Sequence, residues 1–390
     1  MEKLRIGDAC NILNGYAFKS DSYVNEGIRV IRIANVQKGY IEDNSPVYYS
    51  IDSGGLDKYM LEEGDLLMSL TGNVGRVALL QKEMLPAALN QRVACLRIKT
   101  DRITKEFLFH ILNNDFFEQQ CIQASNGVAQ KNISTEWLKD YEIPLYTIEE
   151  QLKISAVLDK IRHIIMLRNN ELRALDELIR ARFIELFGDP KSNPMKWRRM
   201  TLKQAGIRLS DGPFGSNLKS DHYTNEGVRV IRLGNIGVGK FIDNDKSFVS
   251  YEHYKMIEKY TCRAGEIVIG TLGDPNLRAC IVPENIEFAI NKADCVHYIP
   301  KAELLNNYFI CQYINCPETL LLASAMIHGQ TRARISSGQL AELPIYIPPM
   351  ELQDQFAAFV AQIDKSKVAV QKALDQTQLL FDSLMQEYFG

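Results

Sequence analysis

The sequence lacks the features of a membrane or disulfide-stabilised protein. It has no apolar run near the roughly 18 residues that a membrane-spanning helix needs, and its start, Met-Glu-Lys-Leu-Arg, does not resemble a signal peptide. Its eight cysteines are scattered, without a C-x-x-C pair or a histidine at zinc-ligand spacing. The closest two, Cys311 and Cys316, are interpreted as plain buried thiols. These absences predict a cytoplasmic protein that binds no metal.

The sequence also lacks a convincing catalytic motif. GNIGVGKF (234–241) resembles a phosphate-binding loop, but it ends in Phe241 where Ser or Thr would hold Mg²⁺, and no helix is predicted after it. The one Pro-Pro pair, in YIPPM (346–350), is not the Pro-Pro-aromatic segment of a DNA methyltransferase, and no nuclease-type carboxylate–lysine cluster stands out. The six histidines share no spacing with Ser, Cys or Asp. We therefore predict a chain that is not an enzyme.

What the sequence does contain is a long internal repeat. KSDSYVNEGIRVIRIAN at 19–35 recurs as KSDHYTNEGVRVIRLGN at 219–235, and Phe187-Gly188 recurs as Phe389-Gly390. Each copy is long enough to form a domain with its own core, and the period far exceeds that of a solenoid. The mixed part of each copy alternates β-rich runs, such as GDLLMSL (64–70), with helical stretches at 106–122 and 306–324. The repeat predicts a pseudo-two-fold molecule suited to a two-part target.

A long helix without proline or glycine is predicted to end each copy, over 149–187 and 351–389. In each helix, apolar residues recur in steps of four and three over about five heptads, which is the seam of a coiled coil. The seam residues are Ile154, Leu158, Ile161, Ile165, Leu172, Leu175 and Ile179 in the first helix, and Phe356, Val360, Ile363, Val370, Leu374, Phe381 and Leu384 in the second. At 1.5 Å per residue each helix is roughly 58 Å long. The first helix leads away from the first domain and the second leads back, so we expect them to pair antiparallel.

Polar, glycine-containing turns occur at matching places in the two copies. TGNVGR (71–76) matches TLGDPNLR (271–278), NQR (90–92) matches NKAD (291–294), and NGVAQKNIS (126–134) matches HGQTRARIS (328–336). Arg, Lys, Asn and Gln on loops can contact phosphates and base edges, whereas Gly and Asn also occur as ordinary turn residues. The predicted DNA-binding residues are Lys19, Arg32, Asn35, Thr71, Asn73, Arg76, Asn90, Gln91, Arg92, Gln130, Lys131 and Asn132 in the first domain, and Ser216, Asn217, Lys219, Arg232, Asn235, Thr271, Asn276, Arg278, Asn291, Lys292, Arg332 and Arg334 in the second.

Net charge is distributed unevenly along the chain. The total is −3, but residues 191–346 hold 19 Lys and Arg against 15 Asp and Glu, whereas residues 347–390 hold 3 against 6. A modestly basic second domain would attract DNA weakly by itself. We therefore expect DNA binding to be shared with a partner.

In this order and present twice, these features resemble the specificity subunit of a type I restriction-modification system. The matching segments are the EGIRVIR and EGVRVIR strands, the Pro-rich Glu-Gln junctions IPLYTIEEQ (143–151) and LPIYIPPMELQ (343–353), and the FGDP helix exit (187–190), and the resemblance covers all 390 residues. The second junction departs from the pattern in reading MELQ. The resemblance implies an α+β fold with a target-recognition domain at 1–147, a spacer helix at 148–190, a second recognition domain at 191–347 and a second spacer helix at 348–390.

The resemblance also implies partners and a division of labour. Each domain would read one half of a bipartite, asymmetric site in double-stranded DNA, and the coiled coil would dock two methyltransferase subunits. S-adenosylmethionine, ATP and Mg²⁺ would be bound by those subunits and by restriction subunits, not by this chain. Two alternatives remain open: the recognition subunit of another DNA-modification system, and a coiled-coil scaffold that binds protein through its two domains. A scaffold would expose apolar patches on the domains instead of polar loops.

Overall fold

The computed structural model describes residues 2–51, 54–125, 132–325 and 334–390, which form two compact units. Unit 1 comprises residues 1–168 and 373–390, and unit 2 comprises residues 169–372. Each unit therefore contains one mixed domain together with part of both long helices, α5 (Ile148–Phe187) and α10 (Met350–Phe389). No described helix is long and apolar enough to cross a lipid bilayer.

The mixed domain of unit 1 is built on a four-stranded and a three-stranded sheet. The strand orders are β2-β8-β5-β6 and β4-β3-β7, and a separate antiparallel pair joins β1 to β9. The strands are β1 (Glu2–Arg5), β2 (Cys10–Asn14), β3 (Ile28–Ile31), β4 (Tyr48–Tyr49), β5 (Leu66–Ser69), β6 (Val77–Leu79), β7 (Ala87–Leu89), β8 (Val93–Ile98) and β9 (Glu142–Leu145). The short helices are α1 (Ile6–Ala9), α2 (Lys105–Leu112), α3 (Asp115–Ala124) and α4 (Thr135–Asp140).

The mixed domain of unit 2 repeats this plan with a larger second sheet. Its sheets have the orders β11-β19-β16-β17 and β12-β14-β13-β18-β15, and β10 pairs with β20. The strands are β10 (Arg198–Thr201), β11 (Gly206–Ser210), β12 (Tyr223–Thr224), β13 (Val228–Ile231), β14 (Ser247–Val249), β15 (Thr261–Arg263), β16 (Ile267–Gly270), β17 (Arg278–Ile281), β18 (Phe288–Asn291), β19 (Cys295–Pro300) and β20 (Pro344–Ile347). The helices are α6 (Tyr251–Ile257), α7 (Asn307–Asn315), α8 (Pro317–Ser324) and α9 (Ser337–Ala341). Mixed helix and strand content in both domains confirms the predicted α+β fold.

The two helical stretches predicted at 106–122 and 306–324 each divide into two helices. In the first, Asn114 is the N-cap of α3, and its side chain accepts a hydrogen bond from the Phe117 amide at 2.7 Å. In the second, Pro317 begins α8, because proline fits the first turn of a helix but not its interior. Apolar periodicity continued through both breaks, so it indicated the buried residues and missed the division of each stretch into two helices.

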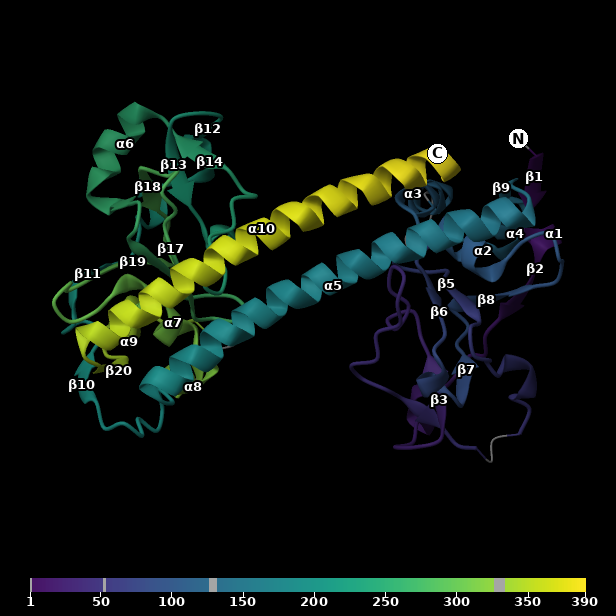
Figure 1. Ribbon diagram of the computed structural model, residues 1–390, viewed down its shortest axis with the longest axis horizontal. Helices are drawn as coiled ribbons and strands as arrows, with labels where there is room; N and C mark the ends of the chain where they lie inside the picture. The colour runs from purple at the N-terminus through teal and green to yellow at the C-terminus, as the bar shows by residue number, and fades with distance from the viewer. Residues whose placement is uncertain (1, 52–53, 126–131, 326–333) are drawn as a thin grey trace. The chain divides into compact units, whose positions relative to one another are not determined.

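The long helices pair antiparallel, as the contacts within each unit show. In unit 1 the start of α5 meets the end of α10: the Tyr146 hydroxyl donates to the Tyr388 carbonyl at 3.0 Å, and the Phe107 and Phe389 rings lie 5.5 Å apart. In unit 2 the end of α5 meets the start of α10, where the rings of Phe183 and Phe356 lie 5.5 Å apart. The two helix segments lie side by side in each unit (Figure 1). All fourteen predicted seam residues are buried or half-buried, as expected for a coiled-coil seam.

A buried glutamine ties each long helix to its own domain. The Gln353 side chain is fully buried and accepts from the Asn306 amide at 2.9 Å. Its Nε2 donates to the carbonyls of Leu304 and Pro348. Gln151 makes the matching three bonds in unit 1, to the Thr104 amide and to the carbonyls of Arg102 and Tyr146. These are the last residues of the two junctions noted in the sequence, IPLYTIEEQ and LPIYIPPMELQ. The second junction differs in reading MELQ, but it retains the glutamine that makes these hydrogen bonds.

Replacing Gln353 with leucine is expected to destabilise unit 2 by about 3 kcal/mol, because buried backbone groups would lose partners at roughly 1–3 kcal/mol each. Urea unfolding of the full chain would measure the change. Gln376→Leu, on an exposed position of α10, is the control and should change stability by less than about 0.5 kcal/mol. Equal effects of the two substitutions would contradict the structural role of Gln353.

Candidate nucleic-acid interface

The polar turns predicted from the sequence meet at one edge of each domain. In unit 2, β13 and β18 run parallel, so the loops that follow them leave from the same edge of the sheet. The amide of Thr271, just after β16, donates to the Asp294 carbonyl at 3.1 Å, and the Ile335 amide donates to the Thr271 carbonyl at 3.0 Å. We call this region, residues 211–219, 232–236, 271–278, 292–294 and 334–336, the loop edge of unit 2.

Unit 1 has the same edge, built in the same way. Its strands β3 and β7 are also parallel, and the Leu70 amide donates to the Arg92 carbonyl at 3.0 Å. The Ile133 amide then donates to the Leu70 carbonyl at 2.9 Å. The loop edge of unit 1 comprises residues 15–19, 32–36, 70–76, 90–92 and 132–134.

A glycine lets a further loop approach each edge closely. A Cβ added at Gly212 would lie 2.1 Å from the Asn291 carbonyl oxygen, and one at Gly15 would lie 2.2 Å from the Asn90 carbonyl. Any side chain would force these loops away from the strand end. The loops that carry Lys19 and Lys219 are held at the edge in this way.

The backbone bonds correct two matches made from the sequence. Thr271 holds the place of Leu70 and not of Thr71, and the second correction concerns NQR and NKAD. NQR and NKAD were matched through Asn90 and Asn291, but the amides of Asn90 and Lys292 make the same bond, to the carbonyls of Ile31 and Ile231. Asn291 instead matches Leu89 at the end of the strand. By the same register Arg92 matches Asp294, a correspondence that reverses the charge at this position.

Several predicted DNA-contacting residues are used inside the domains instead. Asn235 is fully buried, and its Oδ1 accepts from the Arg232 amide at 2.9 Å. Its Nδ2 donates to two carbonyls. Asn35 is buried too, and its Nδ2 donates to the Glu42 carbonyl and the Asp43 carboxylate. The Arg278 guanidinium donates to four backbone carbonyls. Arg76 donates to the Gln37 side chain at 2.6 Å.

The remaining members of this group are the buried residues Thr71, Thr271, Asn276 and Asn291. The six buried residues of this group cannot offer their polar atoms to DNA as the domains stand, and the half-buried Arg76 and Arg278 make their bonds within the domains. The proposed interface therefore leaves out these eight residues.

Other predicted residues do face outward. Those classed as exposed are Lys19, Asn73, Gln91, Arg92, Asn132, Ser216, Asn217 and Lys219. Arg32, Asn90, Arg232, Lys292 and Arg334 are at least partly exposed. Gln130, Lys131 and Arg332 lie outside the described residues. The candidate interface therefore keeps thirteen predicted residues.

Sequence reasoning missed two side chains that organise the edge of unit 2. Tyr223 makes cation–π contacts with two residues: the Arg232 guanidinium lies 5.8 Å and the Lys292 ammonium 5.3 Å from its ring centre. Asp294 forms an ion pair with Arg334 at 2.6 Å. The repeat contained a signal for Tyr223, since Tyr23 stands at the matching place. Nothing in the sequence linked Asp294 to Arg334, because they lie 40 positions apart.

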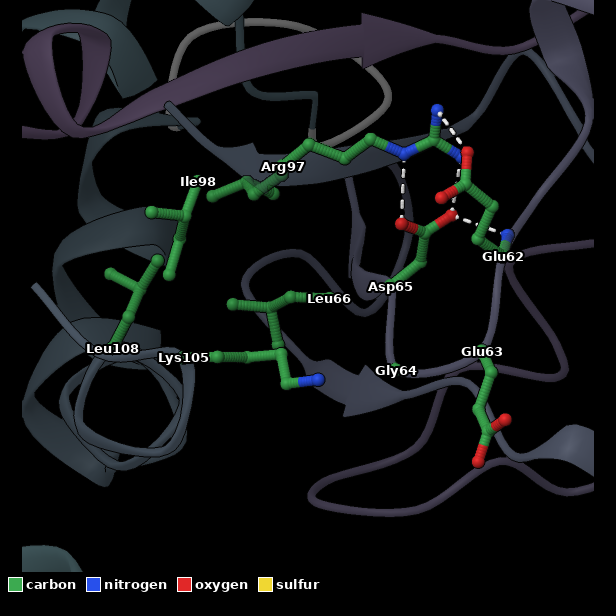
Figure 2. A pocket seen from close by; sticks show the side chains of 10 residues that line it. Glu62, Glu63, Gly64, Asp65, Leu66, Arg97, Ile98, Lys105 and Leu108 are labelled. Carbon is green, nitrogen blue, oxygen red and sulfur yellow. Dashed lines mark hydrogen bonds and ion pairs between the residues drawn. The ribbon is translucent and has the colours of Figure 1, made fainter. Parts of the chain in front are cut away.

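The clearest pocket of the described structure is lined by a cluster of charged side chains. It lies in unit 1, has a volume of about 360 Å³, and is lined in part by Glu62, Asp65, Arg97 and Lys105. Figure 2 shows the Arg97 guanidinium facing the Asp65 and Glu62 carboxylates, which lie 2.7 Å and 3.2 Å away. These ion pairs involve Glu62, Asp65 and Arg97, while Glu63 and Lys105 also line the pocket and no described Ser, Thr, Cys or His does.

The buried histidines are also structural. His110 bonds to Asp159 at 2.9 Å and His297 to Glu266 at 2.8 Å. Burial lowers the pKa of both imidazoles, and the facing carboxylates oppose that effect. All eight cysteines are free and buried, which confirms the interpretation as plain thiols. Among the described residues, no three His, Cys, Asp or Glu side chains are grouped to hold a metal ion.

The family model of the type I restriction modification DNA specificity domain matches residues 1–177 and 216–377. The chain belongs to this family. It is 23% identical to the EcoBI specificity subunit of a type I restriction enzyme from Escherichia coli, over 99% of this chain and 85% of that protein. It is 34% identical to the EcoAI specificity subunit, also from Escherichia coli, over 41% of this chain and 28% of that protein.

A solved structure shares the whole fold. The S subunit of a type I restriction-modification system from M. genitalium matches 100% of this chain and 96% of its own length, with a TM-score of 0.56 and 17% sequence identity. The tandem arrangement of two mixed domains and two long helices is therefore shared with that specificity subunit.

Proposed function

We propose that this chain is the DNA-recognition subunit of a type I restriction-modification complex, and that each loop edge reads one half of a bipartite, asymmetric site. The observation that supports this most directly is the loop edge itself, which is built twice with the same backbone bonds and different side chains. Lys292 stands where Asn90 stands, and Asp294 where Arg92 stands. Two readers of different sequences need a common frame with exchanged contact residues.

The outward residues of the two edges suit DNA. Lys19 and Lys219 are exposed and have no ion pair within the described ranges, so both ammonium groups are available to phosphates. Tyr16, Ala17, Ala34 and Phe214 are exposed apolar residues of the same edges, but most of the other exposed residues there are polar or glycine. This composition favours a nucleic-acid reader over a coiled-coil scaffold that binds protein through its domains.

The same proposal assigns the remaining roles to partners. The long helices would dock two methyltransferase subunits, which bring S-adenosylmethionine, and restriction subunits would join through the complex. The chain would work in the cytoplasm, where its free thiols stay reduced. A recognition subunit of another modification system would share the loop edges and differ in these partners.

The purified chain alone is expected to transfer no methyl group, because the site residues described above include no catalytic constellation. The test is to express the chain with and without its methyltransferase subunit in a host that lacks other adenine methylation, and to map methylated adenines in the host DNA. Methylation at one bipartite site, found only when both chains are present, is the expected result. Methyl transfer by the chain without a partner would contradict the proposal, and so would a partnered complex that methylates no defined site.

A further inference from the structure

Each loop edge has an arginine at or next to the backbone position of Arg92, but the two arginines come from different loops. In unit 1 this arginine is Arg92, which is exposed and has no ion pair within the described residues. In unit 2 the Arg92 position is held by Asp294, whose carboxylate binds the Arg334 guanidinium at 2.6 Å. Arg334 comes from the segment before α9, where Asn132 stands in unit 1 and accepts from the Thr71 hydroxyl at 3.2 Å. Both edges therefore have an arginine at or next to this position, on different loops.

The ion pair in unit 2 indicates which kind of DNA contact Arg334 makes, a phosphate contact or a base contact. An arginine that serves only to attract phosphate gains nothing from a carboxylate beside it, because the pair is close to neutral and the carboxylate repels phosphate. An arginine that reads a base edge does gain, since an ion pair keeps its guanidinium near one place in the loop edge. Lys219, in the same edge, is a contrast: it is exposed and has no ion pair among the described residues.

The Arg334 guanidinium is accessible beside its carboxylate partner. The nearest atoms of the pair are Nη2 of Arg334 and Oδ1 of Asp294, and the Arg334 side chain is 41% exposed while that of Asp294 is 23% exposed. A guanidinium has five N–H donors, so it can bind a carboxylate and still offer two donors to another partner. Two parallel donors of this kind match O6 and N7 of guanine in the major groove.

We propose that Arg334 reads a base edge in the second half-site, with guanine as the favoured base, and that Asp294 is the residue that positions it. Arg92 performs the corresponding reading in the first half-site without a positioning carboxylate. This inference rests on the proposed function and names the specificity-determining residues of the same loop edges.

The test uses the full chain in complex with its methyltransferase subunit. Arg334→Ala is expected to reduce discrimination at one base pair of the second half-site by roughly five- to 150-fold, the range of a single bidentate arginine–guanine contact. The first half-site should stay unchanged, and the slope of binding against salt concentration should change little because the lost group was already paired. Lys219→Ala is the contrasting variant: it should weaken binding to all sequences alike and reduce the salt slope by about one.

Two further variants distinguish reading from a merely structural ion pair. Asp294→Asn keeps the shape but releases the arginine, so discrimination should fall while binding to unrelated DNA strengthens and the salt slope rises. The exchange Asp294→Arg with Arg334→Asp restores an ion pair with its members reversed. It should recover thermal stability without recovering the original second half-site.

Recovery of the original site by the exchanged pair would overturn the inference, since a structural bond would then suffice. A uniform loss of affinity in Arg334→Ala would also overturn it, by showing a phosphate contact. In both cases the wild-type complex still methylates a bipartite site, so the proposed function survives. If the wild-type complex methylates no such site, the proposed function fails and this inference fails with it.

Discussion

A fragment of residues 1–189 is expected to form a symmetric dimer that directs methylation to a palindromic site made of two copies of the first half-site. The structure supplies the reason in matching contacts. Phe389 of α10 lies 5.5 Å from Phe107 in unit 1, and Phe187 of α5 lies 4.8 Å from Phe309 in unit 2. Because Phe107 and Phe309 hold matching positions, Phe187 of one fragment can take the place of Phe389 against Phe107 of another.

The rest of α5 also matches α10, so α5 of a second fragment can replace α10 along the seam. Ile154, Leu158 and Ile161 match the α10 residues Phe356, Val360 and Ile363, and all six are buried. Burying about seven Leu or Ile side chains per helix, at roughly 1.5–3 kcal/mol each, can exceed an association cost of about 4–15 kcal/mol. The charged residue Arg182 does not oppose pairing, because it already binds Glu185 at 2.8 Å. The dimer would be isologous, with the same surface used by both copies.

Sedimentation of the purified fragment and methylation mapping of its complex would test this expectation. Phe187→Ala in the fragment should weaken the dimer, because that ring would sit on the partner copy's domain. Met166→Ala, at an exposed position of α5, is the control and should leave the dimer intact. A strictly monomeric fragment, or one that methylates the original asymmetric site, would show that α5 cannot replace α10.

Phe309→Ala is expected to cost about 3–5 kcal/mol of stability, the usual range for a large ring removed from a core. Phe309 is fully buried, with the Phe187 ring at 4.8 Å and the Phe183 ring stacked at 5.5 Å. These contacts join α7 to the end of α5, so the loss should also loosen the helix from its domain. Calorimetry and urea unfolding of the full chain would measure the change.

Phe116→Ala removes the same side chain from a position that is 51% exposed, and it should cost less than about 1 kcal/mol. Phe107→Ala, the matching change in unit 1, should resemble Phe309→Ala, since Phe107 is equally buried and contacts Phe389. A cost below 1 kcal/mol for Phe309→Ala would mean that the aromatic cluster does not hold α5 to unit 2.

Some elements were predictable because their signals are local. Alternating and continuous apolar runs marked β3, β5 and β8, and the steps of four and three from Ile154 and Phe356 marked the faces that α5 and α10 bury. The repeat required both copies to adopt one fold, and the order of domains and helices required the helices to run in opposite directions. A local pattern of this kind survives folding, because burial of the apolar face is what stabilises the element.

The site depended on contacts that no local pattern contains. The sequence identified polar turns, and it counted Asn235 and Lys219 as equal candidates, yet one is buried and bonded within its loop while the other is exposed. Parallel pairing of β13 with β18 brought distant loops to one edge and shifted the match of NKAD with NQR by one residue. The ion pair of Asp294 with Arg334 joins two loops 40 positions apart.

By itself, therefore, the sequence determined a duplicated α+β protein with two long antiparallel helices and polar turns at matching places. Only the tertiary structure decided which of those polar side chains remain available to a ligand. The physical reason is that a polar group must find a partner when it is buried. Whether that partner is its own loop or a molecule outside depends on which strands pair and which loops they bring together.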